Sequence, residues 1–100
     1  MPQVTVSPMD DQQLVTPEDS RYIRARCVVL APGKEVGNHS TGDKEEVIIL
    51  LQGKVIVSSP GREQELPSLH GAYIPPNTKH NISNPFDEDA IYVYVRSLDK

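Results

Sequence analysis

The 100-residue chain contains no tryptophan, one phenylalanine and one cysteine. A lone Cys27 cannot form an internal disulfide, which excludes the disulfide-stapled secreted domains and suits a reducing cytoplasm. The longest apolar run, Val47 to Leu51, is far shorter than the roughly 20 residues of a membrane span. The first residues lack the basic and apolar regions of a signal peptide. These absences predict a cytoplasmic protein with no membrane partner.

Positive charge is also scarce. Ten Lys and Arg stand against fourteen Asp and Glu, which gives a formal net charge of −4. No short window is rich in Lys or Arg, whereas a nucleic-acid surface needs a concentrated basic patch. The sequence therefore predicts no nucleic-acid partner.

Branched aliphatic residues dominate the apolar part of the composition. The chain has eleven Val, seven Ile and seven Leu but only four Ala. Val and Ile are β-branched, and β-branched residues favour strands. Nine Pro and six Gly indicate many turns. No segment keeps a helical period, and short strands are predicted over 22–31, 45–52, 55–59, 63–66, 72–74, 79–83 and 90–96. The expected fold is one all-β domain, a sandwich or barrel, over 21–100, preceded by an arm or edge strand over 1–20.

Two of these strands carry bulky apolar residues on both faces. The strand over 45–52 has apolar residues on both faces, so both of its faces are predicted to be covered. In the strand over 90–96, Tyr92 and Tyr94 lie opposite the aliphatic face that contains Ile91 and Val95. Aromatic residues on such a face favour a contact with another subunit.

Arg24 and Arg26 share one face of the first long strand, and Cys27 lies on the other. The prediction for the two arginines is a solvated face. If that face turned inward instead, they would indicate an anionic ligand. Cys27 is predicted to be a buried, inert thiol rather than a nucleophile.

Three metal-capable side chains take strand positions that would turn them toward the core. Glu46 shares a face with Ile48, His80 shares a face with Ile82, and His39 precedes the Glu46 strand. A carboxylate inside an aliphatic sheet is costly unless it is paired or ligated. Two imidazoles and one carboxylate form a recognised ligand set for a divalent metal, although a metal-free hydrogen bond between His80 and Glu46 would also satisfy both groups.

At this point the sequence resembles the cupin superfamily, in particular its small single-domain members. The first cupin motif, G(X)5HXH(X)3–4E(X)6G, is matched in every interval by Gly33, His39, Thr41, Glu46 and Gly53. Its second histidine is replaced by Thr41.

The second motif, G(X)5PXG(X)2H(X)3N, is matched from its proline onward. Pro75, His80 and Asn84 stand at the motif's intervals. Asn77 replaces the turn glycine, a mild change because Asn tolerates a positive φ. Leu69 occupies the place of the motif's first glycine.

The resemblance implies a double-stranded β-helix, or jelly-roll barrel, of antiparallel strands. By position in the motifs it also implies that His39, Glu46 and His80 bind a divalent metal, Zn, Mn, Fe or Ni. Thr41 stands where a third imidazole would be, and a neutral hydroxyl is a weaker ligand. The site is therefore either a three-ligand site with open positions or a weakened site without metal. His70 is expected in a surface turn, and Asp43 is a less favoured substitute ligand.

Three functions fit these residues. The first is a metal-dependent enzyme with oxygenase chemistry or isomerase- or lyase-like chemistry, although no general base beyond the ligands is evident. The second is a metal-free module that binds or senses a small molecule. The third is a structural dimer with a vestigial site. In each case a homodimer is expected, because cupins often pair through sheet edges.

Overall fold

The computed structural model describes residues 3–6 and 11–98. Of the arm predicted over 1–20, residues 1–2 and 7–10 therefore lie outside the described residues, as do 99–100 at the other end of the chain. Within the described ranges no helix forms, and hence none could span a bilayer. The cytoplasmic location predicted from the sequence stays a prediction.

Nine strands follow one another in the described part of the chain. They are β1 Gln12–Val15, β2 Ile23–Leu30, β3 His39–Ser40, β4 Glu46–Gln52, β5 Lys54–Ser59, β6 Arg62–Pro67, β7 Gly71–Ile74, β8 Lys79–Ser83 and β9 Ala90–Ser97. All seven predicted strands form, within one or two residues of their expected ends. β1 is an edge strand, and β3 is a two-residue strand that no sequence pattern marked.

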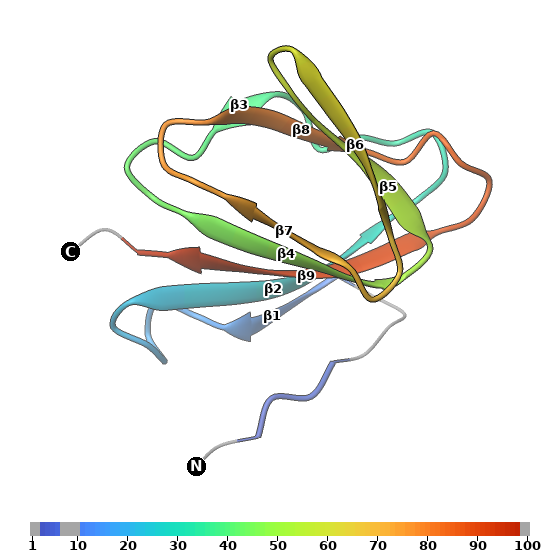
Figure 1. The fold of residues 1–100 in the computed structure, drawn as a ribbon. Helices are drawn as coiled ribbons and strands as arrows, with labels where there is room; N and C mark the ends of the chain where they lie inside the picture. The colour runs from blue at the N-terminus through green and yellow to red at the C-terminus, as the bar shows by residue number, and fades with distance from the viewer. Residues whose placement is uncertain (1–2, 7–10, 99–100) are drawn as a thin grey trace.

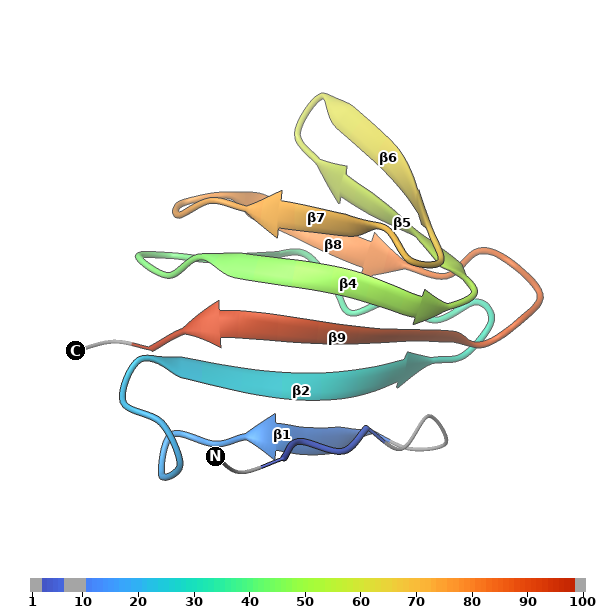
Figure 2. The ribbon, with the colours of Figure 1, turned by 60° about the horizontal axis from the view of Figure 1, so that its bottom comes forward.

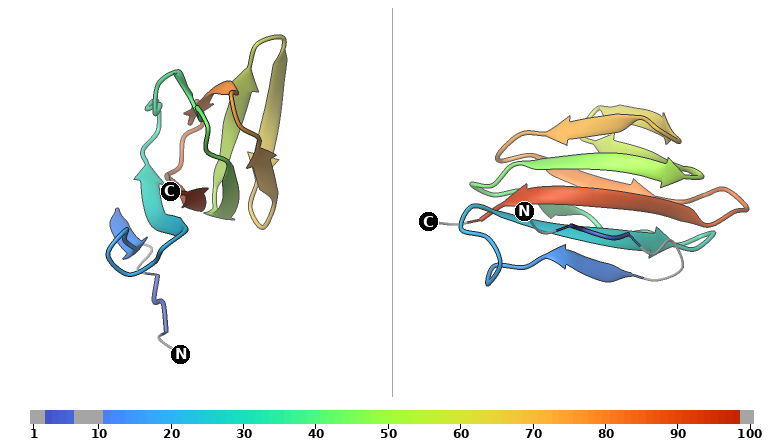
Figure 3. Two further views of the ribbon diagram at one scale, coloured as in Figure 1. Left: turned by 90° about the vertical axis from the view of Figure 1, so that its left-hand side faces the viewer. Right: turned by 90° about the horizontal axis from the view of Figure 1, so that it is seen from below.

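The strands make two sheets that face each other (Figure 1). One has the order β1-β2-β9-β4-β7 and the other the order β3-β8-β5-β6. Every pairing is antiparallel, which confirms the all-β prediction. Figure 2 shows the strands of the larger sheet side by side, and Figure 3 shows that the second sheet covers only one of its faces.

The core lies between the two sheets. Its centre is aliphatic, with Ile48, Leu50 and Val55 fully buried and Ile82 almost so. Cys27, on the opposite face of β2 from Leu30, is buried as predicted. Burial, and then the nearby Asp11 carboxylate, raise the pKa of its thiol. A neutral, enclosed thiol is a poor nucleophile.

The outer face of β4 corrects one prediction. Val47, Ile49 and Leu51 are 40%, 44% and 38% exposed, so a single chain covers only the inner face of this strand. The apolar residues on the outer face are real, but nothing in the described part of the chain packs over them.

On β2 and β9 the face that points between the two sheets is not the one predicted, although Ala25 and Cys27 on the other face of β2 are also buried. Tyr92 is 2% exposed and belongs to the core, with Tyr94 packed against it, so neither forms an external contact surface. The prediction of a solvated face for Arg24 and Arg26 is also wrong, because Leu30 on that same face is in the core. Alternation in a strand defines which residues share a face, but it does not define which face is inside.

Two turns keep a left-handed backbone without glycine. Asn77, in place of the motif glycine, has a φ of 56° as predicted. Leu69, in place of the other motif glycine, has a φ of 64°, which is uncommon for a bulky residue. Its side chain is 82% exposed, so no neighbouring group has to move to accommodate it. The turn keeps its shape, and the cost is the left-handed backbone of Leu69 itself.

Candidate metal and ligand site

Two histidines meet through the pairing of β3 with β8. His39 and His80 are directly opposite each other in the register, and their ring centroids are 4.2 Å apart. His80 is 1% exposed, whereas His39 is half-buried at the edge of the barrel. Two residues 41 positions apart in the sequence are thus neighbours because two short strands pair.

Each ring is anchored at one nitrogen. The Nδ1 of His39 lies 2.9 Å from the carbonyl oxygen of Gly37, and the Nδ1 of His80 lies 3.1 Å from that of Thr78. A carbonyl only accepts, so in a neutral ring Nδ1 carries the hydrogen and Nε2 keeps a free lone pair. This arrangement, with one nitrogen bound to a backbone carbonyl, is the usual one for a histidine that binds metal through the other nitrogen.

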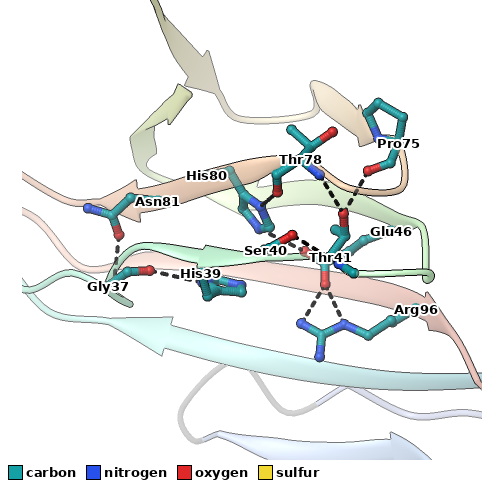
Figure 4. A network of polar contacts seen from close by, with 11 residues as sticks. Gly37, His39, Ser40, Thr41, Glu46, Pro75, Thr78, His80, Asn81 and Arg96 are labelled. Carbon is teal, nitrogen blue, oxygen red and sulfur yellow. Dashed lines mark hydrogen bonds and ion pairs between the residues drawn. The ribbon is translucent and has the colours of Figure 1, made fainter. Parts of the chain in front are cut away.

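Glu46 approaches the histidines from the opposite sheet (Figure 4). Its side chain is 2% exposed, and its Oε2 lies 3.8 Å from the Nε2 of His80. That distance is too long for a hydrogen bond. The Nε2 of His80 is buried, and no group in the described chain hydrogen-bonds to it.

Arg96 holds the other oxygen of Glu46. Its Nε and Nη2 both donate to Oε1, at 2.8 Å each. The two residues are cross-strand partners on β4 and β9. Arg96 was not predicted, because the aliphatic face of the last strand was expected to lie inside. The signal that could have found it is its shared face with Tyr92 and Tyr94.

Thr41 is committed to the backbone. Its hydroxyl donates to the carbonyl of Pro75 at 2.7 Å and accepts from the N–H of Thr78 at 3.1 Å. The side chain is thereby fixed between the two motif regions, next to the site. Asn84, the last residue of the second motif, likewise ties loops together, because its amide donates to the carbonyls of Leu30 and Glu88.

The remaining candidates lie apart from this group. His70 is exposed in the turn before β7, with its Nδ1 near the carbonyl of Ser68, and Asp43 is exposed in the loop before β4. Throughout the described ranges, no three His, Cys, Asp or Glu side chains converge closely enough to hold a metal as they stand. His39, His80 and Glu46 therefore lie in one region, but their side chains are too far apart to coordinate one ion as they stand.

The comparisons with known proteins agree with this architecture. The family model described as Cupin domain matches residues 26–96. The chain therefore belongs to the cupin family. A search of curated proteins found no match.

Solved structures show the same fold. A predicted oxalate decarboxylase from Thermotoga maritima superposes with a TM-score of 0.82 at 20% identity, over 89% of this chain and 79% of that one. A Cupin 2 conserved barrel domain protein from Salinispora arenicola gives 0.77 at 24% identity, over 94% and 80%. The polyketide cyclase RemF from Streptomyces resistomycificus gives 0.80 at 17% identity, over 89% and 64%. The fold is thus a cupin jelly-roll barrel.

Proposed function

We propose that this cupin binds a small molecule inside its barrel, beside a divalent metal ion held by His39, Glu46 and His80. The observation that carries the proposal is the buried Nε2 of His80, which has no hydrogen-bond partner among the described residues. An unsatisfied buried lone pair is costly, and an ion or a ligand is a common reason for one.

The donor set supports a metal of the Fe, Zn, Mn or Ni type. Two neutral imidazole nitrogens and one carboxylate oxygen suit these ions and leave coordination positions open. A bound ion of this kind supplies Lewis acidity to a substrate oxygen or to water. Because the hydroxyl of Thr41 already makes two backbone hydrogen bonds, we assign Thr41 to the support of the site rather than to the metal. If the protein is an enzyme, the proposed reaction is of the oxygenase type or of the isomerase or lyase type.

A metal-free binding module is the second candidate. The contact that favours it is the pair of hydrogen bonds from Arg96, which already compensates the charge of Glu46 without an ion. In that case His39 and His80 would bind the small molecule directly through their Nε2 atoms.

Metal-linked stability separates these two candidates. We expect Zn²⁺, Mn²⁺, Fe²⁺ or Ni²⁺ to raise the melting temperature of protein that was first passed over a chelating resin. A ligand at one hundred times its Kd adds about 2.7 kcal/mol of stability. His80→Ala and Glu46→Ala should each abolish the rise, and His70→Ala, an exposed histidine outside the site, should retain it.

Equal rises in all three variants would show that the metal binds elsewhere. No rise with any of the four ions would refute the metal site and leave the metal-free module as the function.

We also propose that the functional unit is a homodimer joined through the outer face of the large sheet. The two central cross-strand rows on this face contain no charge, because Val47 has Val95 and Tyr73 beside it, and Ile49 has Val93 and Gly71. The exposed carboxylate of Glu45 lies at the end of the face, where it accepts a hydrogen bond from the hydroxyl of Tyr73. An exposed apolar face of this kind usually marks an interface. Two copies of a face with an uncharged centre can stack on each other about a two-fold axis without opposing like charges there.

Equilibrium sedimentation tests the dimer. We expect twice the chain mass of 11.1 kDa for the unmodified protein, and the single-chain mass for the double variant Val47→Asp, Ile49→Asp. Leu69→Asp is the control, since Leu69 is an exposed leucine that lies in a turn outside this face. A monomer for the unmodified chain, or an unchanged dimer for the double variant, would contradict the proposed interface.

A further inference from the structure

The inner face of β2 carries two arginines toward the barrel interior. Arg24 and Arg26 alternate with Cys27 and share their face with Leu30, which is in the core. In the register Arg26 pairs with Tyr94, and Arg24 pairs with Arg96. Both arginines are half-buried, and their Nε atoms are buried without a hydrogen-bond partner in the described chain.

Arg26 lines a cavity of about 200 Å³ that also reaches the candidate metal site. His39, Glu46 and Arg96 contribute the polar part of its lining, together with the rings of Tyr92 and Tyr94. Val28, Val36 and Ile82 make the apolar part. A cavity this small suits a compound of a few carbon atoms rather than a drug-sized ligand.

The charges that line this cavity do not balance. Glu46 is the one carboxylate among the lining residues, and Arg96 already donates two hydrogen bonds to it. Among the described residues that line the cavity, no counter-ion is thus left for the guanidinium of Arg26, although the chain as a whole has a net charge of −4. A partly buried cation that faces a cavity is costly unless something anionic pairs with it.

A carboxylate meets this requirement. The guanidinium presents its N–H groups in a planar fork that matches the two oxygens of a carboxylate. The apolar wall would contact the hydrocarbon part of the same molecule. Burial, and then the Glu46 carboxylate, raise the pKa of Tyr92, so its phenol stays protonated and adds no negative charge to the cavity.

We infer that the barrel cavity binds a small organic acid and that Arg26 holds its carboxylate. This inference rests on the proposed function, since it names the ligand class for the same barrel. It does not depend on the metal, because Arg26 is separate from the proposed metal ligands.

The test compares isobutyrate with isobutyramide, which has the same shape and no charge. Binding is measured by calorimetric titration of protein stripped on a chelating resin and again of protein with added Zn²⁺. We expect isobutyrate to bind and isobutyramide not to bind. Arg26→Met should weaken isobutyrate binding about tenfold or more, as expected for the loss of hydrogen bonds to a charged group. Arg21→Met, at an exposed arginine just before β2 and outside this cavity, should leave it unchanged.

Arg26→Lys is a second variant in case Arg26→Met does not fold. It keeps the positive charge and the long side chain but removes the planar guanidinium. It should bind isobutyrate more weakly than the unmodified protein. Equal binding of the acid and the amide, no binding of the acid in either preparation, or full affinity in both Arg26 variants would each overturn the inference. If isobutyrate binds but no metal shifts the melting temperature, the metal proposal fails and the carboxylate site stands.

Discussion

Replacing Arg96 by methionine is expected to lower the free energy of unfolding by about 3 kcal/mol, the lower part of the range for breaking a buried ion pair. The carboxylate of Glu46 is 2% exposed and receives both of its hydrogen bonds from Arg96. Methionine keeps much of the hydrocarbon volume but supplies no donor and no charge. The main cost is therefore the burial of an unpaired carboxylate. Chemical denaturation followed by circular dichroism measures this change.

Arg24→Met is the matched control for that variant. Arg24 lies opposite Arg96 in the same cross-strand row and is also half-buried, but it has no carboxylate partner in the described chain. Two like charges directly opposite each other are unfavourable, so we expect this substitution to cost little or to stabilise the fold. The double variant Glu46→Gln, Arg96→Met should recover much of the lost stability, since a neutral amide is cheaper to bury than a carboxylate.

A loss below about 1 kcal/mol in Arg96→Met would show that the pair behaves like a solvent-exposed ion pair. The same variant also bears on the metal. Arg96 and a metal ion would both be stabilised by the negative charge of Glu46, and so they compete for it. Under the metal proposal, the metal-linked rise in melting temperature should therefore be larger in Arg96→Met than in the unmodified protein.

The candidate ligands and the inner charges were predictable to different degrees. Motif spacing brought His39, Glu46 and His80 to attention, and the structure places them in one region. Arg96 was not found, and Arg26 was expected on a solvated face, with an anionic ligand as the alternative if that face turned inward. Both strands carry apolar residues on both faces. A period of two assigns residues to faces, and the choice of the inner face then depends on which side is the more apolar. In β2 and β9 the side that faces away from the second sheet is at least as apolar as the inner side, so that rule failed.

The fold was more accessible than the site. Turn signals and β-branched residues located seven strands, because those signals are local. The two-residue β3 carries no pattern of its own, and its pairing with β8 depends on where the rest of the barrel places it. Glu46 and Arg96 are 50 residues apart in the sequence. Their contact depends on the pairing of β4 with β9, and no local signal encodes that pairing.

Gly53→Ala is expected to be among the most damaging single substitutions in the barrel. Gly53 joins β4 to β5 with a φ of +75°, and a Cβ built there would lie 2.6 Å from the carbonyl oxygen of Asp89 and 3.1 Å from the Cα of Ala90. Both contacts are with backbone, which cannot rotate away as a flexible side chain can. Strain and overpacking together predict a loss of about 3 kcal/mol or more.

Gly61 isolates the steric part of that loss. It joins β5 to β6 with nearly the same φ, +77°, and an added Cβ would meet nothing within 4 Å. Gly61→Ala should therefore cost only the left-handed backbone strain, about 1 kcal/mol. Unfolding of both variants in denaturant gives the difference, and equal costs would refute the steric reason for glycine at position 53.

The same close approach connects this turn to the site. Asp89 and Ala90 lead into β9, and the register of β4 against β9 shifts between Leu50 and Gln52, next to Gly53. If an alanine pushes the start of β9 outward, the ladder that aligns Glu46 with Arg96 is disturbed at its far end. We therefore expect Gly53→Ala, unlike Gly61→Ala, to weaken isobutyrate binding as well as stability. Unchanged binding in a folded Gly53→Ala protein would show that the shift at Leu50–Gln52 absorbs the displacement before it reaches the site.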